Sequence, residues 1–156
     1  MAIETGQKAP EITLWDSEKQ LVKLSEQAGK NVVLLFFPLA FTGTCTKELC
    51  SVRDNMQIYN DLNATVFGIS VDSLHALKKF KEEQNLNFSL LSDFNKVASR
   101  DYDTIYENFF NDMNGVSKRS AFVIDKEGVV RYAEVLENAL DIPNFTAIQD
   151  CLKELN

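Results

Sequence analysis

A chain of 156 residues is long enough for one domain with a sizeable buried core. Its hydrophobic content of 45% is typical of a folded globular protein and excludes a disordered chain. The formal net charge is -7 and no basic cluster stands out, which argues against nucleic acid and anionic membranes as partners.

The chain also lacks the patterns of a secreted or membrane protein. Residues 1–6 have neither the basic nor the apolar stretch of a signal peptide, and the longest apolar run, 32–41, is too short to span a bilayer. We therefore expect a cytoplasmic protein. Three cysteines is an odd number, and a structural disulfide framework would be unusual in that compartment.

The N-terminal part predicts a β-hairpin. Two short apolar stretches, 12–14 and 21–24, flank the polar residues 16–19, as two strands flank a turn. The polar stretch 25–30 is expected to form at most one helical turn that ends at Gly29.

A central strand and a helix follow. Residues 31–37 are apolar without alternation, which is typical of a strand covered on both faces. Pro38 cannot donate to a β-ladder, so this strand should end there. From Cys45 onward apolar residues recur at spacings of three and four, as on one face of a helix: Leu49, Val52, Met56 and Tyr59.

The rest of the chain continues to alternate. We expect a strand over 64–71, a helix capped by Asp72 or Ser73, a strand over 88–91 and a short helix through Val97 and Tyr102. Residues 103–118 show no regular pattern and are expected to form a long loop. The stretches 120–125 and 129–135 flank a short link with Gly128 and predict a second hairpin, and 144–155 predicts a closing helix.

This order of elements predicts the fold class. Strands alternating with helices favour an α/β layered sheet, and the late hairpin makes the central sheet mixed. No linker, repeat or low-complexity segment interrupts the chain, so we expect a single domain over residues 1–156.

Cys45 stands where the buried strand turns into a helix. The N–H groups of a first helical turn have no intrahelical partner and favour negative charge, hence the thiolate. The alternative for an unpaired cysteine is a small buried hydrophobe. Three neighbours favour a reactive thiol: Thr42 supplies a hydroxyl, Gly43 lets the backbone approach, and Pro38 rigidifies the loop and shields the sulfur.

The pattern Pro38-x-x-x-Thr42-x-x-Cys45 resembles the active-site motif of the peroxiredoxins. Three further segments resemble that family: 36–43, which is similar to the alkyl hydroperoxide reductase E type, 90–93 and 119–125. The resemblance implies a thioredoxin-like fold and a thiol-dependent peroxidase that reduces hydrogen peroxide and organic hydroperoxides. It implies no metal and no bound organic cofactor.

The resemblance also assigns roles to single residues. Cys45 is the peroxidatic cysteine, whose thiolate attacks the O–O bond and becomes a sulfenic acid. Arg119 matches the arginine that, together with the Thr42 hydroxyl and backbone N–H groups, holds the peroxide oxygens; otherwise it is a surface charge beside Lys118. Glu48 matches the glutamate that orients this arginine, and it also fits a capping-box acid.

Cys50 departs from the alkyl hydroperoxide reductase E pattern. Many bacterioferritin comigratory proteins, the peroxiredoxin Q group, carry a cysteine five residues after the peroxidatic one, where it resolves the sulfenic acid. The resemblance implies the same role for Cys50, with ordinary core packing as the alternative. Five residues along a helix separate Cα atoms by roughly 8–9 Å, whereas a disulfide needs them within about 7 Å. Cys45 and Cys50 can therefore bond only if the helix between them unwinds.

The remaining candidates are weaker. Cys151 lies near the apolar face of the last helix, where core packing is expected and a resolving role is the alternative. His75 is the only histidine and receives no function, and the chain has no C-x-x-C and no phosphate-binding loop. The resemblance further implies thioredoxin or another small redoxin as reductant. It allows a homodimer through Phe41 and the aromatic residues of the stretch 102–110.

Three other functions remain open at this point. One is a one-cysteine mechanism in which an external thiol resolves Cys45 directly. A second is a thiol–disulfide oxidoreductase on the same fold, which the missing C-x-x-C disfavours. The third is a non-catalytic redox-sensing protein, which slow reaction of Cys45 with peroxide would indicate.

We predict that peroxide treatment produces a disulfide between Cys45 and Cys50, because the resemblance to the peroxiredoxin Q group implies that Cys50 resolves the sulfenic acid. Mass spectrometry of peptides from the alkylated protein measures this bond directly. A sulfenic acid that persists at Cys45 would contradict the prediction.

Overall fold

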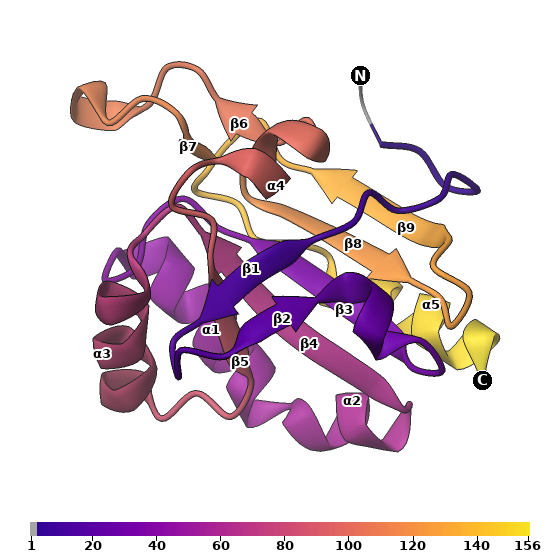
Figure 1. The fold of residues 1–156 in the computed structure, drawn as a ribbon. Coiled ribbons are helices and arrows are strands. Elements are labelled where there is room, and N and C mark those ends of the chain that lie inside the picture. The colour runs from indigo at the N-terminus through magenta and orange to yellow at the C-terminus, as the bar shows by residue number, and fades with distance from the viewer. Residues whose placement is uncertain (1–2) are drawn as a thin grey trace.

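Seven strands form one mixed sheet in the computed structural model, which describes residues 3–156 (Figure 1). They are β1 (Thr13–Asp16), β2 (Leu21–Lys23), β3 (Asn31–Phe36), β4 (Ala64–Ser70), β5 (Ser89–Ser92), β8 (Ser120–Ile124) and β9 (Val130–Val135). Their order is β2-β1-β5-β4-β3-β8-β9. Strand β3 runs parallel to β4 and antiparallel to β8, so the sheet is mixed at its centre.

Helices cover both faces of this sheet. They are α1 (Gly43–Asp54), α2 (Met56–Asp61), α3 (Leu74–Gln84), α4 (Val97–Asp101) and α5 (Phe145–Leu155), with 3-10 turns η1 (Leu24–Gln27) and η2 (Phe110–Asp112). Two further strands, β6 (Ile105–Tyr106) and β7 (Val116–Ser117), pair with each other outside the main sheet. Among the described residues, no helix combines the length and the apolarity needed to cross a membrane.

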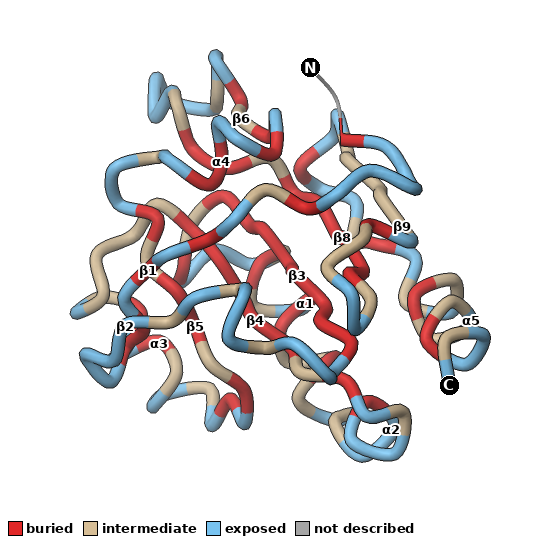
Figure 2. The backbone as a smooth tube through the Cα atoms, turned by 45° about the vertical axis from the view of Figure 1, so that its right-hand side comes forward, coloured by how far each residue is buried: buried red, intermediate tan, exposed pale blue. Residues whose placement is uncertain are grey.

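Strand β3 lies at the centre of the core, and all six of its residues are buried. Figure 2 shows it as a red stretch in the interior of the molecule. Its side chains alternate between two hydrophobic clusters. Val33 and Leu35 pack in the cluster that includes residues of α1, α2, α3 and α5, whereas Val32, Leu34 and Phe36 pack with the N-terminal segment and α4.

The expected class is confirmed: an α/β fold with a mixed central sheet, flanking helices and an N-terminal β-hairpin. Strand β3 ends before Pro38, as predicted. The cap of α3 is Ser73, whose hydroxyl accepts a hydrogen bond from the Ala76 amide at 3.1 Å. The closing helix and the hairpin of β8 and β9 also lie where the sequence places them.

Two expectations about local structure are wrong. The apolar pattern that starts at Leu49 does not belong to one helix, because α1 ends at Asp54 and a separate helix, α2, begins after Asn55. The Asn55 side chain donates to the Ser51 carbonyl at 2.9 Å, the kind of local bond that competes with helix propagation. The stretch 103–118 is not a plain loop, since it contains β6, η2 and β7. Strands of two residues are too short to show a periodicity of two.

Candidate active site

The turn from β3 to α1 is fixed by hydrogen bonds from its own backbone amides to the neighbouring strand β4 and to Asp72, which follows β4. The Phe37 amide donates to the Ile69 carbonyl at 2.9 Å, and the Ala40 amide donates to the Asp72 carboxylate at 2.8 Å. Pro38 is buried between these two contacts. The loop then starts α1 at Gly43, so Cys45 lies in the first helical turn with its side chain fully buried.

Arg119 reaches the Cys45 sulfur from the side of β8, which pairs with β3 on the side opposite β4. It immediately precedes β8, whose Ser120 pairs with Phe36 at the end of β3. Its Nη2 donates to the Cys45 sulfur at 3.2 Å, and its Nη1 donates to a Glu48 carboxylate oxygen at 2.7 Å. The sequence-predicted residues Cys45, Glu48 and Arg119 therefore meet in one buried cluster, although 71 residues separate the last two in the chain.

Burial acts differently on the two members of the Glu48–Arg119 pair. Burial raises the pKa of Glu48 to about 7, and the attraction of Arg119 only partly offsets it. For Arg119, burial opposes the charge, but the negative charges of Glu48 and Cys45 outweigh it and raise the pKa. Near neutral pH the arginine is thus charged while the carboxyl group titrates. The second oxygen of Glu48, Oε2, is buried without a hydrogen-bond partner.

Two residues that the sequence did not single out, Ala139 and Leu136, hold Arg119 in place, and Tyr106 in turn holds Leu136. The Nε of Arg119 donates to the Ala139 carbonyl at 2.9 Å. The Arg119 carbonyl accepts from the Leu136 amide at 2.9 Å, and the Leu136 carbonyl accepts from the Tyr106 hydroxyl at 2.6 Å. A backbone carbonyl carries no signal in the sequence, but Tyr106 stood out as an aromatic residue in an otherwise polar stretch.

Thr42 lies at the N-cap of α1, but its hydroxyl is not bonded to the Cys45 sulfur. The hydroxyl donates to the Leu39 carbonyl at 2.8 Å, and its backbone carbonyl accepts from the amide and the hydroxyl of Thr46. The structure thus places Thr42 beside the first turn of α1, where it shapes the loop from Leu39 onward. Its hydroxyl keeps the capacity to accept a hydrogen bond.

The other two cysteines lie apart from the sulfur of Cys45, and all three thiols are free. Cys50 follows Cys45 within the same unbroken helix α1, and its sulfur donates to the Gln84 side-chain oxygen at 3.5 Å. Cys151 lies on α5, where its sulfur donates to the Arg131 carbonyl at 3.8 Å. Burial raises the pKa of the Cys151 thiol. Both residues pack against the hydrophobic core.

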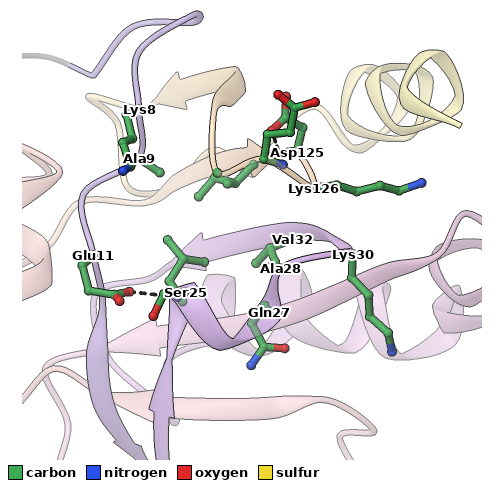
Figure 3. A pocket seen from close by; sticks show the side chains of 14 residues that line it. Lys8, Ala9, Glu11, Ser25, Gln27, Ala28, Lys30, Val32, Asp125 and Lys126 are labelled. Atoms are coloured by element: carbon green, nitrogen blue, oxygen red, sulfur yellow. Dashed lines mark hydrogen bonds between the residues drawn. The ribbon is translucent and has the colours of Figure 1, made fainter.

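Two hollows flank the sheet at opposite ends. One, of about 570 Å³, is lined by Tyr106, Phe109, Phe110 and Ala139 among others, and the Ala139 carbonyl accepts the hydrogen bond from Arg119. The other, of about 490 Å³, lies at the start of β3 and the end of β8 and is shown in Figure 3. Two of the three acidic side chains that line it are already engaged: Glu11 accepts from two backbone amides, and Asp125 accepts from two amides and from Arg131.

The described residues contain no set of side chains for binding a metal ion. Within residues 3–156, no group of three or more histidine, cysteine, aspartate or glutamate side chains is arranged to hold a metal ion. The cluster at Cys45 instead joins a sulfur, a buried positive charge and a carboxyl group, which is an arrangement for stabilising a thiolate and a second negative oxygen beside it.

Comparison with known proteins identifies the family of this chain. Residues 5–133 match the model of the AhpC/TSA family. The chain is 42% identical over 130 residues to peroxiredoxin Bcp of Bacillus subtilis, which covers 82% of each protein. It is 38% identical over 136 residues to alkyl hydroperoxide reductase E of Mycobacterium bovis, which covers 85% of this chain and 86% of that protein.

A solved structure shows the same fold. The crystal structure of peroxidoxin BcpB from Mycobacterium tuberculosis superposes with a TM-score of 0.87 at 27% identity and covers 99% of both chains. The chain therefore belongs to the AhpC/TSA family, in the class of thiol-dependent peroxidases called peroxiredoxins. The thioredoxin-like fold implied by the sequence is confirmed by this match.

We predict that Glu48→Gln flattens the pH dependence of stability. The folded-state pKa of Glu48, about 7, lies above its ordinary value of 4.5, so the folded protein binds this proton more tightly than the unfolded chain. The associated stability is fully present below about pH 4.5 and is lost as the pH rises through about 7, for a total of about 3 kcal/mol.

Urea unfolding between pH 4.5 and pH 8 measures this effect. Wild type should lose free energy of unfolding over that range relative to Glu48→Gln, whose amide does not titrate. Glu127→Gln, at an exposed acidic residue, is the matched control and should follow wild type. Parallel curves for wild type and Glu48→Gln would contradict the prediction.

Proposed function

We propose that this protein reduces hydrogen peroxide and organic hydroperoxides with Cys45 as the peroxidatic residue. One observation carries the proposal: a buried arginine donates a hydrogen bond to a buried cysteine sulfur in the first turn of a helix. The positive charge of Arg119 and the free N–H groups of the helix start both favour the thiolate. Glu48 orients Arg119, because it binds Nη1 while Nη2 faces the sulfur.

The proposed first step is a displacement on the peroxide oxygen. The Cys45 thiolate attacks the terminal oxygen of ROOH, the S–O bond forms as the O–O bond breaks, and RO⁻ leaves. With one proton from solvent the products are a Cys45 sulfenic acid and ROH, or water from hydrogen peroxide. Arg119 stabilises the negative charge as it moves from the sulfur to the leaving oxygen. Pro38 shields the sulfur from solvent, and Thr42 shapes the loop around it.

The proposed second step joins the two cysteines of α1. The Cys50 sulfur attacks the sulfenic sulfur of Cys45, a disulfide forms and water leaves. Thioredoxin or another small redoxin then returns both thiols by disulfide exchange. The spacing of the two cysteines and the similarity to a Bcp peroxiredoxin support this step. The helix between them must open first, as their separation along α1 requires.

A one-cysteine cycle is the second candidate. It is favoured by the reduced arrangement itself, in which α1 is unbroken and Cys50 is bonded to Gln84 rather than directed at Cys45. In that cycle an external thiol attacks the Cys45 sulfenic acid directly, and Cys50 serves as core packing.

The proposal includes a cytoplasmic location and a homodimer. Phe41 and Phe110 are 52% and 58% exposed, and both belong to segments that border the site. Burial of such side chains against a second copy is a favourable way to remove apolar surface from water.

Sedimentation velocity should therefore show a dimer in wild type, and Phe110→Ser should shift it toward monomer; a monomeric wild type would contradict this.

We predict distinct outcomes for the three cysteine variants in peroxide turnover with thioredoxin. Cys45→Ser should abolish turnover, because it removes the nucleophile. Cys50→Ser should still consume one equivalent of peroxide but should lose thioredoxin-dependent turnover. Cys151→Ser, a matched control on α5, should keep both. Full turnover by Cys50→Ser would favour the one-cysteine cycle, and residual turnover by Cys45→Ser would refute the role of Cys45.

A further inference from the structure

The two halves of α1 are attached to the rest of the protein by different groups. The N-terminal half is attached through Cys45 and Glu48, both of which bind the buried Arg119. The C-terminal half is attached through Arg53. Its Nη1 donates to the Gln84 carbonyl at the end of α3, and its own carbonyl accepts from the Asn87 side chain at 3.2 Å.

Cys50 belongs to the second set of contacts. Its sulfur donates to the Gln84 side-chain oxygen, so the same residue binds both Cys50 and Arg53. The guanidinium of Arg53 also interacts electrostatically with this sulfur. The pKa of Arg53 is raised first by its hydrogen bond to Asp54 and further by the charge of Cys50. Cys50 thus lies beside a positive charge and against a fixed helix end.

Oxidation weakens only the first set of contacts. The bond from Arg119 to a thiolate joins two opposite charges, and it weakens when the sulfur becomes a neutral sulfenic acid and only the guanidinium charge remains. Glu48 is costly to bury, since its Oε2 already lacks a partner. The contacts of Arg53, Gln84 and Asn87 contain no group that the reaction with peroxide changes. The chemistry therefore loosens the start of α1 and leaves its end attached.

We propose that Arg53 and Gln84 are positioning residues that hold Cys50 in place while the first half of α1 unwinds and carries Cys45 to it. The inference rests on the proposed resolving role of Cys50. The unwound part is 43–48, and the remaining turn of helix is too short to persist without tertiary contacts. Val52, only 1% exposed, and the Arg53–Gln84 contact provide them.

This arrangement favours the second step in two ways. Only one partner of the new disulfide has to find the other, because Cys50 is already ordered in the reduced protein. The positive charge of Arg53 beside the Cys50 sulfur also stabilises negative charge on that sulfur during its attack on the sulfenic sulfur of Cys45. That attack forms the S–S bond and breaks the S–O bond, and the hydroxide that leaves takes a proton to become water.

The test separates the two chemical steps in Arg53→Met. Rapid quenching with an alkylating agent and mass spectrometry give the rate of Cys45 oxidation and the rate of disulfide formation. We expect an unchanged oxidation rate, about tenfold slower disulfide formation, and more sulfinic acid at Cys45. Arg53→Lys, which keeps the charge, should recover most of the rate. Arg131→Met is the matched control, because Arg131 lies on the edge strand β9 and pairs with Asp125 rather than with Gln84.

Amide exchange measured by NMR on the reduced protein provides a second readout. The Lys47 amide should exchange faster than the Asp54 amide in wild type, and Arg53→Met should remove the difference. Equal exchange in wild type, or unchanged disulfide formation in Arg53→Met, would overturn the inference while leaving the resolving role intact. Failure of wild type to form any Cys45–Cys50 disulfide would instead refute the resolving role, and this inference with it.

Discussion

The buried guanidinium of Arg119 is the interaction on which the site depends. A charge removed from water is strongly unfavourable unless hydrogen bonds replace its hydration. Here three nitrogens have acceptors on Cys45, Glu48 and the Ala139 carbonyl. Those acceptors come from α1 and from the segment after β9, so the guanidinium is satisfied only when β8 lies against β3. The position of β8 beside β3 therefore brings the guanidinium to the Cys45 sulfur.

The same interaction makes the site less stable than its surroundings. Glu48 shares the buried environment, and its pKa of about 7 shows that its charged form is only partly compensated there. A reactive thiolate requires this concentration of charge, whereas a stable core favours neutral side chains. In the proposed cycle, the start of α1 thus combines a reactive cysteine with an attachment that oxidation weakens. The more ordinary contacts of Arg53 and Val52 keep the rest of the helix in place.

The sequence was informative about the residues that chemistry constrains. The apolar run before Pro38 and the cysteine after it predicted the strand-to-helix turn, and the family resemblance led to Arg119 and Glu48. Tertiary contacts were beyond reach, because backbone acceptors such as the Ala139 carbonyl have no residue-type signal. The bond from the Thr42 hydroxyl to the Leu39 carbonyl also could not be predicted, because its acceptor is a backbone carbonyl that only the loop geometry brings within reach. The break at Asn55 was missed because α2 keeps the apolar periodicity of α1.

The interruption of the helix at Asn55 limits how far an opening of α1 can spread. Because the helix is interrupted at Asn55, an opening that begins at Cys45 has no continuous helix through which to reach α2 and the strand β4 beneath it. In the proposed cycle, the oxidised molecule would expose one short segment on an otherwise native body. Proteases and chaperones that recognise extended unfolded chains would then find little to engage.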